Sequence, residues 1–529
     1  MPGTTFRNPG QECQAPIYDA GMTATASAGV RAARLKVGLE IHVELATRRK
    51  MFAPSANPAH PSHFDQEPNS LVDPVVAALP GALPVMNRRA VEMSMMVGLA
   101  LNCTIARFSK WDRKNYYYPD LPKGYQISQY DLPLCHDGHV DLPTPSGTKR
   151  IGIIRAHLEE DTGKLGHELP GGHHYEGSLV DLNRAGAPLL EIVTAPDFDT
   201  AADVVLFAQE LRNLCRFLGV TEGIMQKGHM RFEPNINVIM ELDDGTTVKT
   251  PVVEVKNLNS FKALRGAIDF EETAQVKRWQ QDGKVMGPGA KSTRGWDDVK
   301  NVTVLQREKE DAHDYRYFPE PDLLPVRVDD AWLSAVRAQI PELPLARKQR
   351  YATEYGLDDK DTSALVAERD HCLFFDAVVA ALGGGKKAGF AAGKFLLNQL
   401  AKRANELGVE LHQAGLAPAQ VAGIIALRED GSLGAQNVDA LVAHLAGTTL
   451  EARAAAEQHG LLTVRDDAAL DRWIDEAVAA NAQAAADVRA GKTAAMGRIV
   501  GAVMKLAGGK VDAKAVNAAI LKKLQGGGG

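Results

Sequence analysis

The feature that most constrains the fold is the stretch Lys36–Leu45, in which apolar and polar residues alternate strictly. The polar positions carry Glu40, His42 and Glu44. A period of two predicts a half-buried β-strand, on which residues two apart lie roughly 6.5–7 Å from each other on one side. Glu40 and His42 therefore project into one volume, as in a metal or proton-transfer site. An ordinary sheet with a solvated polar face has the same pattern, and Glu44 is expected to be solvated surface.

Length and composition predict an ordinary intracellular protein of several domains. The chain has 529 residues, which suggests about three domains. It has no apolar run of the roughly 18–20 residues that span a membrane, and residues 1–34 lack the apolar segment of a secretory signal. Five scattered cysteines without zinc-ligand spacing argue against a disulfide framework and fit a reducing cytoplasm. The net charge of −6 does not indicate a nucleic-acid binder, although a local basic surface is compatible with it.

Further alternating segments predict that several strands lie near the first one. They are Ile151–Glu159, Leu189–Val193, Met230–Met240 and Val252–Lys256. Pro234 suggests an edge strand or a bulge, and strict alternation would place Glu160 on the apolar face unless the strand ends or bulges there. Helices are predicted at Asn87–Leu101, Asp199–Leu218 and about 261–281, the last with Ser260 as N-cap. From about residue 410 onward the chain is Ala-rich with helical periodicity.

The predicted strands share a polar face of unusual composition. It carries Glu40 and His42, His157 and Glu159, Glu191, Glu233 and Asn235, and Glu254 and Lys256. Carboxylates gathered on one face raise each other's pKa and cost stability, and one or two divalent cations would relieve that cost. Carboxylates with little imidazole suit Mg²⁺ or Mn²⁺, and Mg²⁺ in such sites usually serves the phosphates of ATP.

Three basic residues, Lys256, Arg184 and Arg231, could neutralise the oxygens of a transferred phosphoryl group. The usual phosphate loops, G-x-x-x-x-G-K-[ST] and G-x-G-x-x-G, are absent from the sequence. A bound nucleotide is therefore expected on the carboxylate-bearing sheet.

Eight ordered motifs resemble one known family. They are Val37–Glu44, Asp112–Asp120, Tyr125–Gln129, His157–Lys164, Leu179–Arg184, Pro188–Val193, Val255–Phe261 and Asp314–Asp322. The chain resembles the B subunit of the tRNA-dependent amidotransferase, the GatB family, over essentially everything after residue 35.

The resemblance implies an α+β fold in three parts after a disordered extension over residues 1–34. Residues 35–330 would form a mostly antiparallel, cradle-shaped catalytic domain related to glutamine synthetase. Residues 331–408 would form an all-α helical domain, and residues 409–529 an α-helical tail domain of the YqeY type. The segment Gly491–Lys505 is similar to the signature of that tail, whose basic end is a possible tRNA-binding surface.

The implied activity is that of a carbon–nitrogen ligase with ATP and Mg²⁺ as cofactors. ATP phosphorylates the side-chain carboxylate of Glu-tRNA(Gln) or Asp-tRNA(Asn), and ammonia then displaces the phosphate to give the amide. No glutaminase constellation is visible in this chain, so the ammonia would come from an amidase, the A subunit, which a small C subunit ties into a heterotrimer. The resemblance also implies a cytoplasmic location, misacylated tRNA as substrate and no membrane partner.

The resemblance assigns roles to named residues. The metal ligands would be Glu40, His42, Glu160, Glu191 and Glu233. The catalytic residues would be Glu159, Arg184, Lys256 and Asn257, and the cofactor contacts Asn259, Arg231 and Asn235. The tRNA 3′ end would meet Tyr116, Lys123, Tyr125 and Gln126, because aromatic stacking and phosphate contacts serve single strands.

Two departures from the family pattern affect these assignments. Arg231–Asn235 reads Arg-Phe-Glu-Pro-Asn where many relatives have Arg-Cys-Asp-Ala-Asn, so the acid at Glu233 is one methylene longer. Met51–Ser55 stands where some relatives carry a cysteine cluster, so no structural zinc is predicted.

Two other functions fit parts of the sequence. One is a stand-alone ATP-dependent carboxylate–amine ligase acting on a free amino acid. The other is a non-catalytic RNA-binding protein. The aromatic-basic loop and the helical tail disfavour the first, since a small substrate needs neither. The acidic sheet face disfavours the second, since carboxylates repel phosphate unless a metal intervenes.

Overall fold

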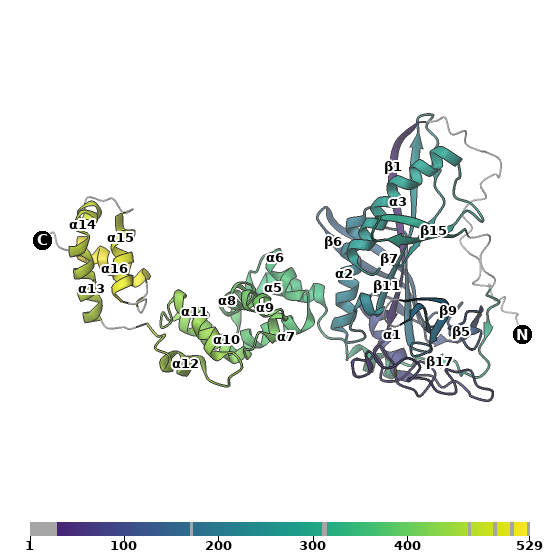
Figure 1. Ribbon diagram of the computed structural model, residues 1–529, viewed down its shortest axis with the longest axis horizontal. Coiled ribbons are helices and arrows are strands. Elements are labelled where there is room, and N and C mark those ends of the chain that lie inside the picture. The colour runs from purple at the N-terminus through teal and green to yellow at the C-terminus, as the bar shows by residue number, and fades with distance from the viewer. Residues whose placement is uncertain are drawn as a thin grey trace, which may run out of the picture. The chain divides into compact units, whose positions relative to one another are not determined.

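The computed structural model describes residues 29–169, 173–308, 315–463, 467–489, 495–507, 511 and 513–525. The chain divides into two compact units, Met1–Pro344 and Leu345–Gly529 (Figure 1). The predicted extension up to residue 28, Asp314 and residues 491–494 of the tail signature lie outside the described residues. Within the described ranges, no helix has the length and apolar character needed to cross a membrane.

A large sheet organises the first unit. Among the described residues its strand order is β15-β14-β13-β11-β1-β10-β7-β6-β2, with β12 paired to β11. The strands are β1 (Val30–Glu44), β2 (Thr104–Ile105), β6 (Cys135–Thr144), β7 (Gly147–Glu160), β10 (Pro188–Thr194), β11 (Met230–Leu242), β12 (Thr247–Lys249), β13 (Val253–Lys256), β14 (Ser292–Asp297) and β15 (Val302–Glu308). All the pairs are antiparallel except β13 with β14. A mixed fold, with this sheet and a helical C-terminal part, is confirmed.

Strand β1 lies at the centre of the sheet, as its alternation suggests. The apolar side chains from Val37 to Val43 are all buried. Two predictions, one on where strand β1 begins and one on Pro234 in the neighbouring strand, were wrong. The strand begins at Val30, so the predicted extension to residue 34 is too long. Pro234 lies on an interior strand without a bulge, paired with Leu39; the ladder to β13 begins only at Asn235, so Pro234 stands beside its end.

Helices α1 (Arg88–Ala100), α2 (Ala201–Phe217) and α3 (Phe261–Asp282) share one hydrophobic core with the apolar face of the sheet. Their bounds agree with the predicted helices to within two residues. Ser260 is the N-cap of α3, and its side chain accepts a hydrogen bond from the Ala263 amide at 3.0 Å. Gly283, at φ 66°, ends this helix in the left-handed conformation. The helices thus cover one face of the sheet and leave the other for polar side chains.

Replacing Ser260 by alanine is expected to lower the free energy of unfolding of the first unit by about 1 kcal/mol, because the Ala263 amide loses its acceptor. Urea unfolding followed by the fluorescence of the buried Trp111 and Trp279 measures this change. Ser260→Asp should stay close to the wild type, because aspartate is an equally good N-cap. Equal losses in both variants would contradict the assigned cap.

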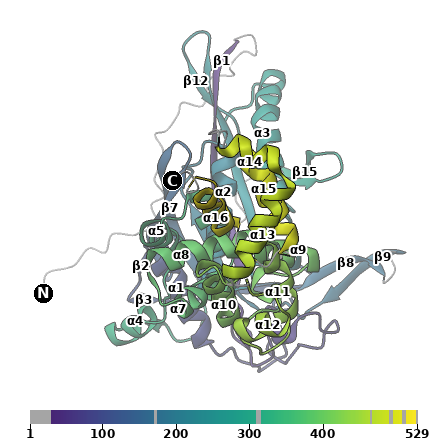
Figure 2. The same ribbon diagram turned by 90° about the vertical axis from the view of Figure 1, so that its left-hand side faces the viewer.

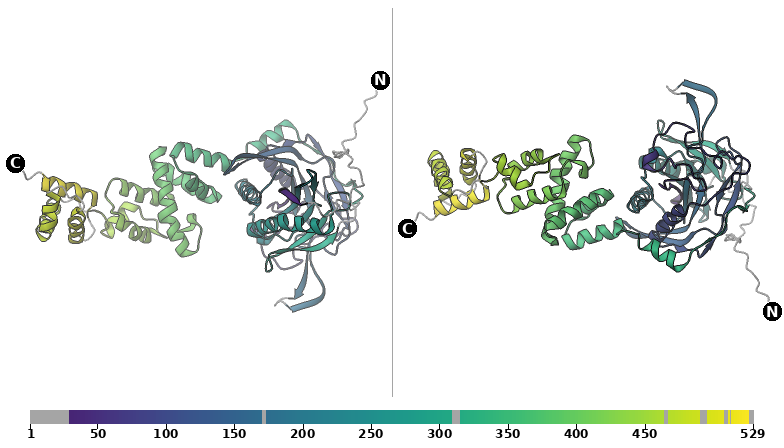
Figure 3. Two further views of the ribbon diagram at one scale, coloured as in Figure 1. Left: turned by 90° about the horizontal axis from the view of Figure 1, so that it is seen from above. Right: turned by 90° about the horizontal axis from the view of Figure 1, so that it is seen from below.

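Three small sheets surround the large one. They pair β3 (Phe108–Ser109) with β17 (Val326–Arg327), β4 (Asp112–Asn115) with β5 (Tyr125–Ser128) and β16 (Phe318–Pro319), and β8 (Lys164–Leu169) with β9 (His173–Asp181). The β4–β5 pair packs beside β7, where the Ser128 hydroxyl reaches Glu159 at 3.3 Å. The β8–β9 hairpin projects from its unit in Figures 2 and 3. Helix α4 (Asp330–Arg337) packs against α1.

In its described residues the second unit consists of helices joined by loops, with one isolated β-bridge between Leu433 and Leu462. Its helices are α5 (Pro344–Tyr355), α6 (Asp359–Val366), α7 (Arg369–Ala381), α8 (Gly385–Phe395), α9 (Ala401–Leu407), α10 (Pro418–Glu429), α11 (Val438–Leu445), α12 (Ala452–Gln458), α13 (Asp467–Ala480), α14 (Ala482–Arg489), α15 (Met496–Leu506) and α16 (Ala513–Gln525). One hydrophobic core spans residues 351–456 and another spans residues 474–524. The boundary expected at residues 408 and 409 stays a prediction.

Candidate functional site

Strand register brings acidic side chains and imidazoles from four strands into one row. His42 on β1 pairs with Glu191 on β10, and Glu191 pairs with His157 on β7. On the other side of β1, Glu40 pairs with Glu233 on β11. Directly paired residues project to the same face of a sheet. The residues that sequence alternation grouped therefore meet at the face opposite the helices.

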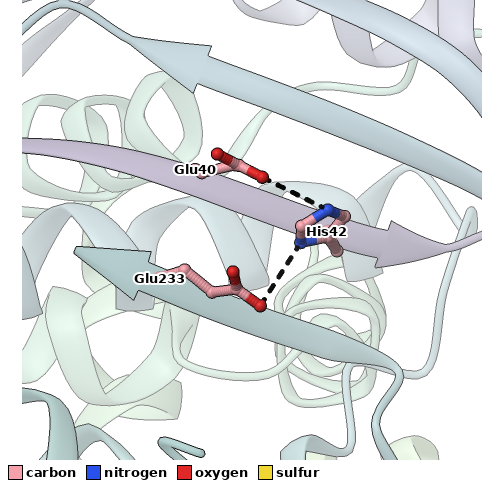
Figure 4. A group of neighbouring side chains, drawn as sticks. All are labelled: Glu40, His42 and Glu233. Atoms are coloured by element: carbon pink, nitrogen blue, oxygen red, sulfur yellow. Dashed lines mark ion pairs between the residues drawn. The ribbon is translucent and has the colours of Figure 1, made fainter. Parts of the chain in front are cut away.

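We call Glu40, His42, Glu159, Glu191 and Glu233 the acidic cluster. His42 Nε2 lies 3.7 Å from both Glu40 Oε1 and Glu191 Oε2, and its Nδ1 lies 3.9 Å from Glu233 Oε1. Figure 4 shows the imidazole between the Glu40 and Glu233 carboxylates. Two groups, Glu40–His42–Glu233 and His42–Glu159–Glu191, each bring one ligand atom per residue within 4.8 Å of the others. His42 belongs to both groups and so stands at the centre of the cluster.

Burial and neighbouring charges move the pKa values of the cluster in opposite directions. Burial and the charge of Glu191 raise the pKa of Glu40. Burial also opposes ionisation of Glu191, but His157 and His42 hold the pKa of Glu191 well below its usual range. Burial by itself lowers the pKa of His42, yet the contact with Glu191 and the charge of Glu233 outweigh it and raise that pKa to about 9. Without a metal, a protonated His42 therefore balances part of the carboxylate charge.

The donor atoms of the cluster suit a hard divalent cation. Carboxylate oxygens predominate, with a single imidazole in each group, and this composition favours Mg²⁺ or Mn²⁺ over softer metals. His42 Nδ1 and Asn235 Oδ1 are buried polar atoms without a hydrogen-bond partner. Buried polar atoms without partners are uncommon and often mark the place of an ion or a ligand. A divalent cation would neutralise the same carboxylates that face His42.

Two sets of basic side chains border the cluster. Lys256 on β13 donates to Glu233 Oε2 at 2.5 Å and lies 3.3 Å from Glu254 Oε1. Arg231, paired in register with His42, donates from Nη2 to Asp161 Oδ2 at 2.8 Å. Arg184 Nε lies 3.6 Å from the same Asp161 oxygen. Carboxylates thus hold the three predicted basic side chains close to the cluster.

Glu44 was expected to be solvated surface, and this prediction was wrong. The residue is only 3% exposed. Burial and the nearby Asp161 carboxylate raise the pKa of Glu44 to about 8, against the opposing charges of Arg231 and Arg184. Alternation correctly placed Glu44 on the polar face. The segment of Gly228 and His229 lies beside it: the Glu44 amide donates to the His229 carbonyl at 3.0 Å, and a Cβ atom on Gly228 would lie 3.7 Å from Glu44 Oε1.

Of the five residues predicted as metal ligands, only Glu160 lies apart from the acidic cluster. It continues strand β7 without a bulge and is buried. Its Oε1 accepts from the Ile127 amide at 2.9 Å and forms an ion pair with Lys123. Gln126 Nε2 donates to the Glu160 carbonyl at 2.7 Å. The structure therefore joins Glu160 to the β4–β5 loop and leaves its role as a ligand a prediction.

The predicted tRNA-contacting residues differ in accessibility. The Tyr116 hydroxyl donates to Gln126 Oε1 at 2.5 Å, and Gln126 is buried. The Arg113 guanidinium lies over the Tyr125 ring, with its Cζ atom 4.3 Å from the ring centroid. The more exposed aromatic residues of this loop are Tyr117 and Tyr118. Asn257 and Asn259 are exposed in the turn after β13, where Asn257 adopts a φ of 64°.

Three residues at the site were not among the catalytic, metal-binding or substrate-binding residues predicted from the sequence. His157 Nε2 lies 3.6 Å from Glu191 Oε2, Lys114 Nζ lies 3.8 Å from Glu159 Oε2, and Asp161 holds the two arginines. The alternation of β7 already grouped His157 with Glu159. No sequence signal places Lys114 there, because strand β4 approaches β7 only through tertiary packing.

His229, whose carbonyl accepts from the Glu44 amide, offers a test of the electrostatics of this segment. Burial and the charge of Lys227 lower the pKa of His229 to about 4. Between pH 6.5 and 4 the unfolded chain therefore binds a proton that the folded chain refuses, so stability falls as the pH falls. The expected loss is at most about 3 kcal/mol. In His229→Gln, unfolding free energies measured at pH 7, 5.5 and 4.5 should fall less steeply than in the wild type; parallel curves would contradict the assignment.

Comparison with known proteins agrees with this geometry. Residues 35–334 match the model of the GatB/GatE catalytic domain, and residues 373–524 match that of the GatB domain. The B subunit of the aspartyl/glutamyl-tRNA(Asn/Gln) amidotransferase of Trichlorobacter lovleyi is 41% identical over 490 residues, covering 93% of this chain and 99% of that protein. The protein of the same name from Moorella thermoacetica is 40% identical over 489 residues, covering 92% and 99%. The chain belongs to the GatB family of tRNA-dependent amidotransferase subunits.

Proposed function

We propose that this chain activates the side-chain carboxylate of a glutamate or aspartate esterified to tRNA, as the ATP-dependent subunit of an amidotransferase. Its family makes it part of a ligase that acts in translation. The names of its relatives include both tRNA(Asn) and tRNA(Gln), and we propose that one or both misacylated tRNAs are substrates here. Activation by a phosphoryl group is proposed because the amide cannot form directly from an ionised carboxylate.

The observation that carries this proposal is the acidic cluster itself. Four carboxylates around one imidazole, with Lys256 and Arg231 at the border, form a site that would repel phosphate without a cation and attract it with one. Mg²⁺ prefers oxygen ligands, and one or two of these carboxylates would suffice to hold an ion that also binds phosphate groups. A surface that only bound RNA would gain nothing from buried carboxylates.

We infer the following roles for the residues. Glu40, His42, Glu191 and Glu233 would hold Mg²⁺, with Glu159 nearby, and the ion would supply charge neutralisation to the phosphates of ATP. Lys256 and Arg231 are close enough to the cluster to bind phosphoryl oxygens, and Arg184 is held beside them through Asp161. Asn257, Asn259 and Asn235 are proposed as polar contacts to the nucleotide or the reacting end of the substrate. His42 must lose its proton before it can bind the metal.

The finer organisation is also a proposal. We infer a cradle related to glutamine synthetase over residues 35–330, a helical domain over residues 331–408 and a YqeY-like tail over residues 409–529. The ammonia would come from an amidase, the A subunit, held together with a small C subunit in the cytoplasm. Met51–Ser55 offers no cysteine ligands, which supports the absence of a structural zinc at that position.

The test is amidation by the reconstituted complex. This chain, purified with its amidase and small subunits, should convert misacylated tRNA to the amidated form with glutamine and ATP–Mg²⁺. Ammonium chloride should replace glutamine, since it bypasses the amidase, and EDTA should abolish both reactions. The proposal fails if the amide never forms on tRNA, or if free glutamate or aspartate is amidated equally well.

A further inference from the structure

We propose that three tyrosines beside the acidic cluster stack on an adenine base, that of the terminal adenosine of the tRNA. We call Tyr130, Tyr315 and Tyr317 the tyrosine wall. The inference rests on the proposed function, because it assigns the binding site for one part of its substrate. None of these three tyrosines is among the site residues predicted from the sequence.

The rings of the wall form a continuous aromatic surface from two distant segments. Tyr130 and Tyr317 stack with centroids 4.1 Å apart and an interplanar angle of 11°. Tyr315 meets Tyr317 edge to face at 6.0 Å, and Tyr116 meets Tyr315 in the same way at 6.0 Å. Tyr130 is nevertheless 52% exposed. One face of its ring covers Tyr317, so the exposed remainder is available to a further flat ring.

The segment that carries Tyr315 and Tyr317 is held firmly against strand β4. The Asn115 amide donates to the Tyr315 carbonyl at 2.9 Å, and Asn115 Nδ2 donates to the Arg316 carbonyl at 2.8 Å. Arg316 takes a φ of 46°, which is uncommon for a residue with a long side chain. Two residues further on, Phe318 pairs with Arg113 in the β16–β4 ladder. A wall held in this way binds a base with little loss of conformational entropy.

The wall adjoins the acidic cluster through Lys114. This lysine lies 3.8 Å from Glu159 Oε2 and 5.3 Å from the centroid of the Tyr315 ring. Burial, with the Glu159 and Glu191 carboxylates, raises the pKa of Tyr317 to about 12 against the charge of Lys114. The geometric link between the wall and the cluster is Lys114, which contacts both Glu159 and the Tyr315 ring. A nucleoside stacked on the wall would present its ribose, and anything esterified to it, toward the cluster.

Strand order favours the tRNA end over the adenine of ATP. Along β13-β11-β1-β10-β7, Lys256 marks one end of the acidic cluster and Glu159 the other. The predicted phosphate-binding cations Lys256 and Arg231 lie on the β13 and β11 side, whereas the wall lies on the β7 side, where Lys114 links Glu159 to the Tyr315 ring. The exposed Tyr118 meets Tyr116 edge to face at 6.2 Å, and Tyr117 in the same loop is also exposed. Several exposed rings suit the successive bases of a single strand.

The experiment uses the reconstituted complex with ammonium chloride as nitrogen donor. Tyr130→Ala should raise the KM for misacylated tRNA by about 5- to 150-fold, the range expected when one base loses its stacking partner. The KM for ATP should not change. Tyr130→Phe should restore the KM for tRNA, because the stacking ring is retained. Tyr175→Ala is the matched control: this tyrosine on β9 is 41% exposed and lies in the projecting hairpin.

A binding cycle identifies the base. Fluorescein-labelled tRNA with and without its terminal adenosine is titrated against wild-type and Tyr130→Ala complexes. If the wall binds that adenosine, its removal weakens binding to the wild type but changes binding to Tyr130→Ala much less. Equal losses in both complexes would overturn the inference, as would a rise in the KM for ATP alone, which would assign the wall to the nucleotide.

The two proposals fail separately. Normal kinetics of Tyr130→Ala for both substrates, in a complex that amidates tRNA, would refute the tyrosine wall and leave the proposed function intact. A wild-type complex that forms no amide would refute the proposed function itself. Thermal unfolding of each variant, expected to match the wild type because Tyr130 is exposed, checks that the fold is retained.

Discussion

Glu191→Gln is expected to lower ammonium-driven amidation by about 1000-fold or more. Glu191 lies between His42 and His157, with Oε2 3.7 Å and 3.6 Å from their Nε2 atoms. Glutamine has nearly the same shape but no charge, so the variant loses the ligand that we propose for the metal and the anion that faces the protonated His42. The loss of a preorganised electrostatic contact typically costs about 10²–10³ in rate, and the loss of a metal ligand adds to that. The rate of ATP-dependent amide formation on tRNA measures the effect.

Ammonium chloride makes this assay specific for the present chain, since it removes any need for glutamine hydrolysis. Glu241→Gln is the matched control, because Glu241 is an exposed glutamate on β11 outside the acidic cluster. His42→Ala should be as inactive as Glu191→Gln, and Mn²⁺ binding measured by electron paramagnetic resonance should weaken in both. Full ammonium-driven activity in either variant would refute the assignment of the metal site.

Asp161→Asn is expected to lower the free energy of unfolding by about 3 kcal/mol, because buried ion pairs are costly to break from one side. Asp161 is buried and its Oδ2 contacts Arg231 at 2.8 Å and Arg184 at 3.6 Å. Both guanidiniums lose their ionised partner in the variant. The charges of these arginines hold the pKa of Asp161 well below its usual range, even though burial opposes ionisation. Urea unfolding at pH 7 measures the loss.

Glu44→Gln provides a control at the same arginines. The pKa of Glu44 is raised to about 8, so this carboxyl is mostly protonated at pH 7 and an amide replaces it without removing a charge. We expect a change below about 1 kcal/mol at pH 7, as for a substitution that conserves volume. Similar losses in Asp161→Asn and Glu44→Gln would contradict the opposite ionisation states assigned to the two residues.

Alternation in the sequence predicted on which face of the sheet a side chain lies, but not whether that side chain is buried. Alternation along β1, β7 and β11 correctly grouped Glu40, His42, Glu159 and Glu233 on one face, because side-chain direction in a strand depends only on position. It could not show that Glu44 is covered while Glu40 is partly accessible. That difference depends on tertiary neighbours of the strand's end, among them Gly228, His229 and Asp161.

Residues contributed by other elements were harder to foresee. Lys114 reaches Glu159 only because the β4–β5 pair lies beside β7, and Tyr317 stacks on Tyr130 only because two distant segments of the chain meet there. In the loop, the sequence favoured Tyr116 and Gln126 as substrate contacts, yet these two hydrogen-bond to each other, and Gln126 is buried. Motif composition identified the loop correctly but did not distinguish its anchored side chains from its exposed ones.

The sequence by itself determined the strands, their polar face, the capped helix α3 and the family, since each depends on local periodicity, on a capping residue or on ordered motifs. Only the tertiary structure decided which strands are neighbours, and therefore that His42 stands between Glu191 and Glu233. It also decided that Glu160 turns toward Lys123 and that Asp161 joins two arginines. Local patterns specify the direction of a side chain along its own strand, whereas the distance between charges on different strands depends on register and packing, which are properties of the whole fold.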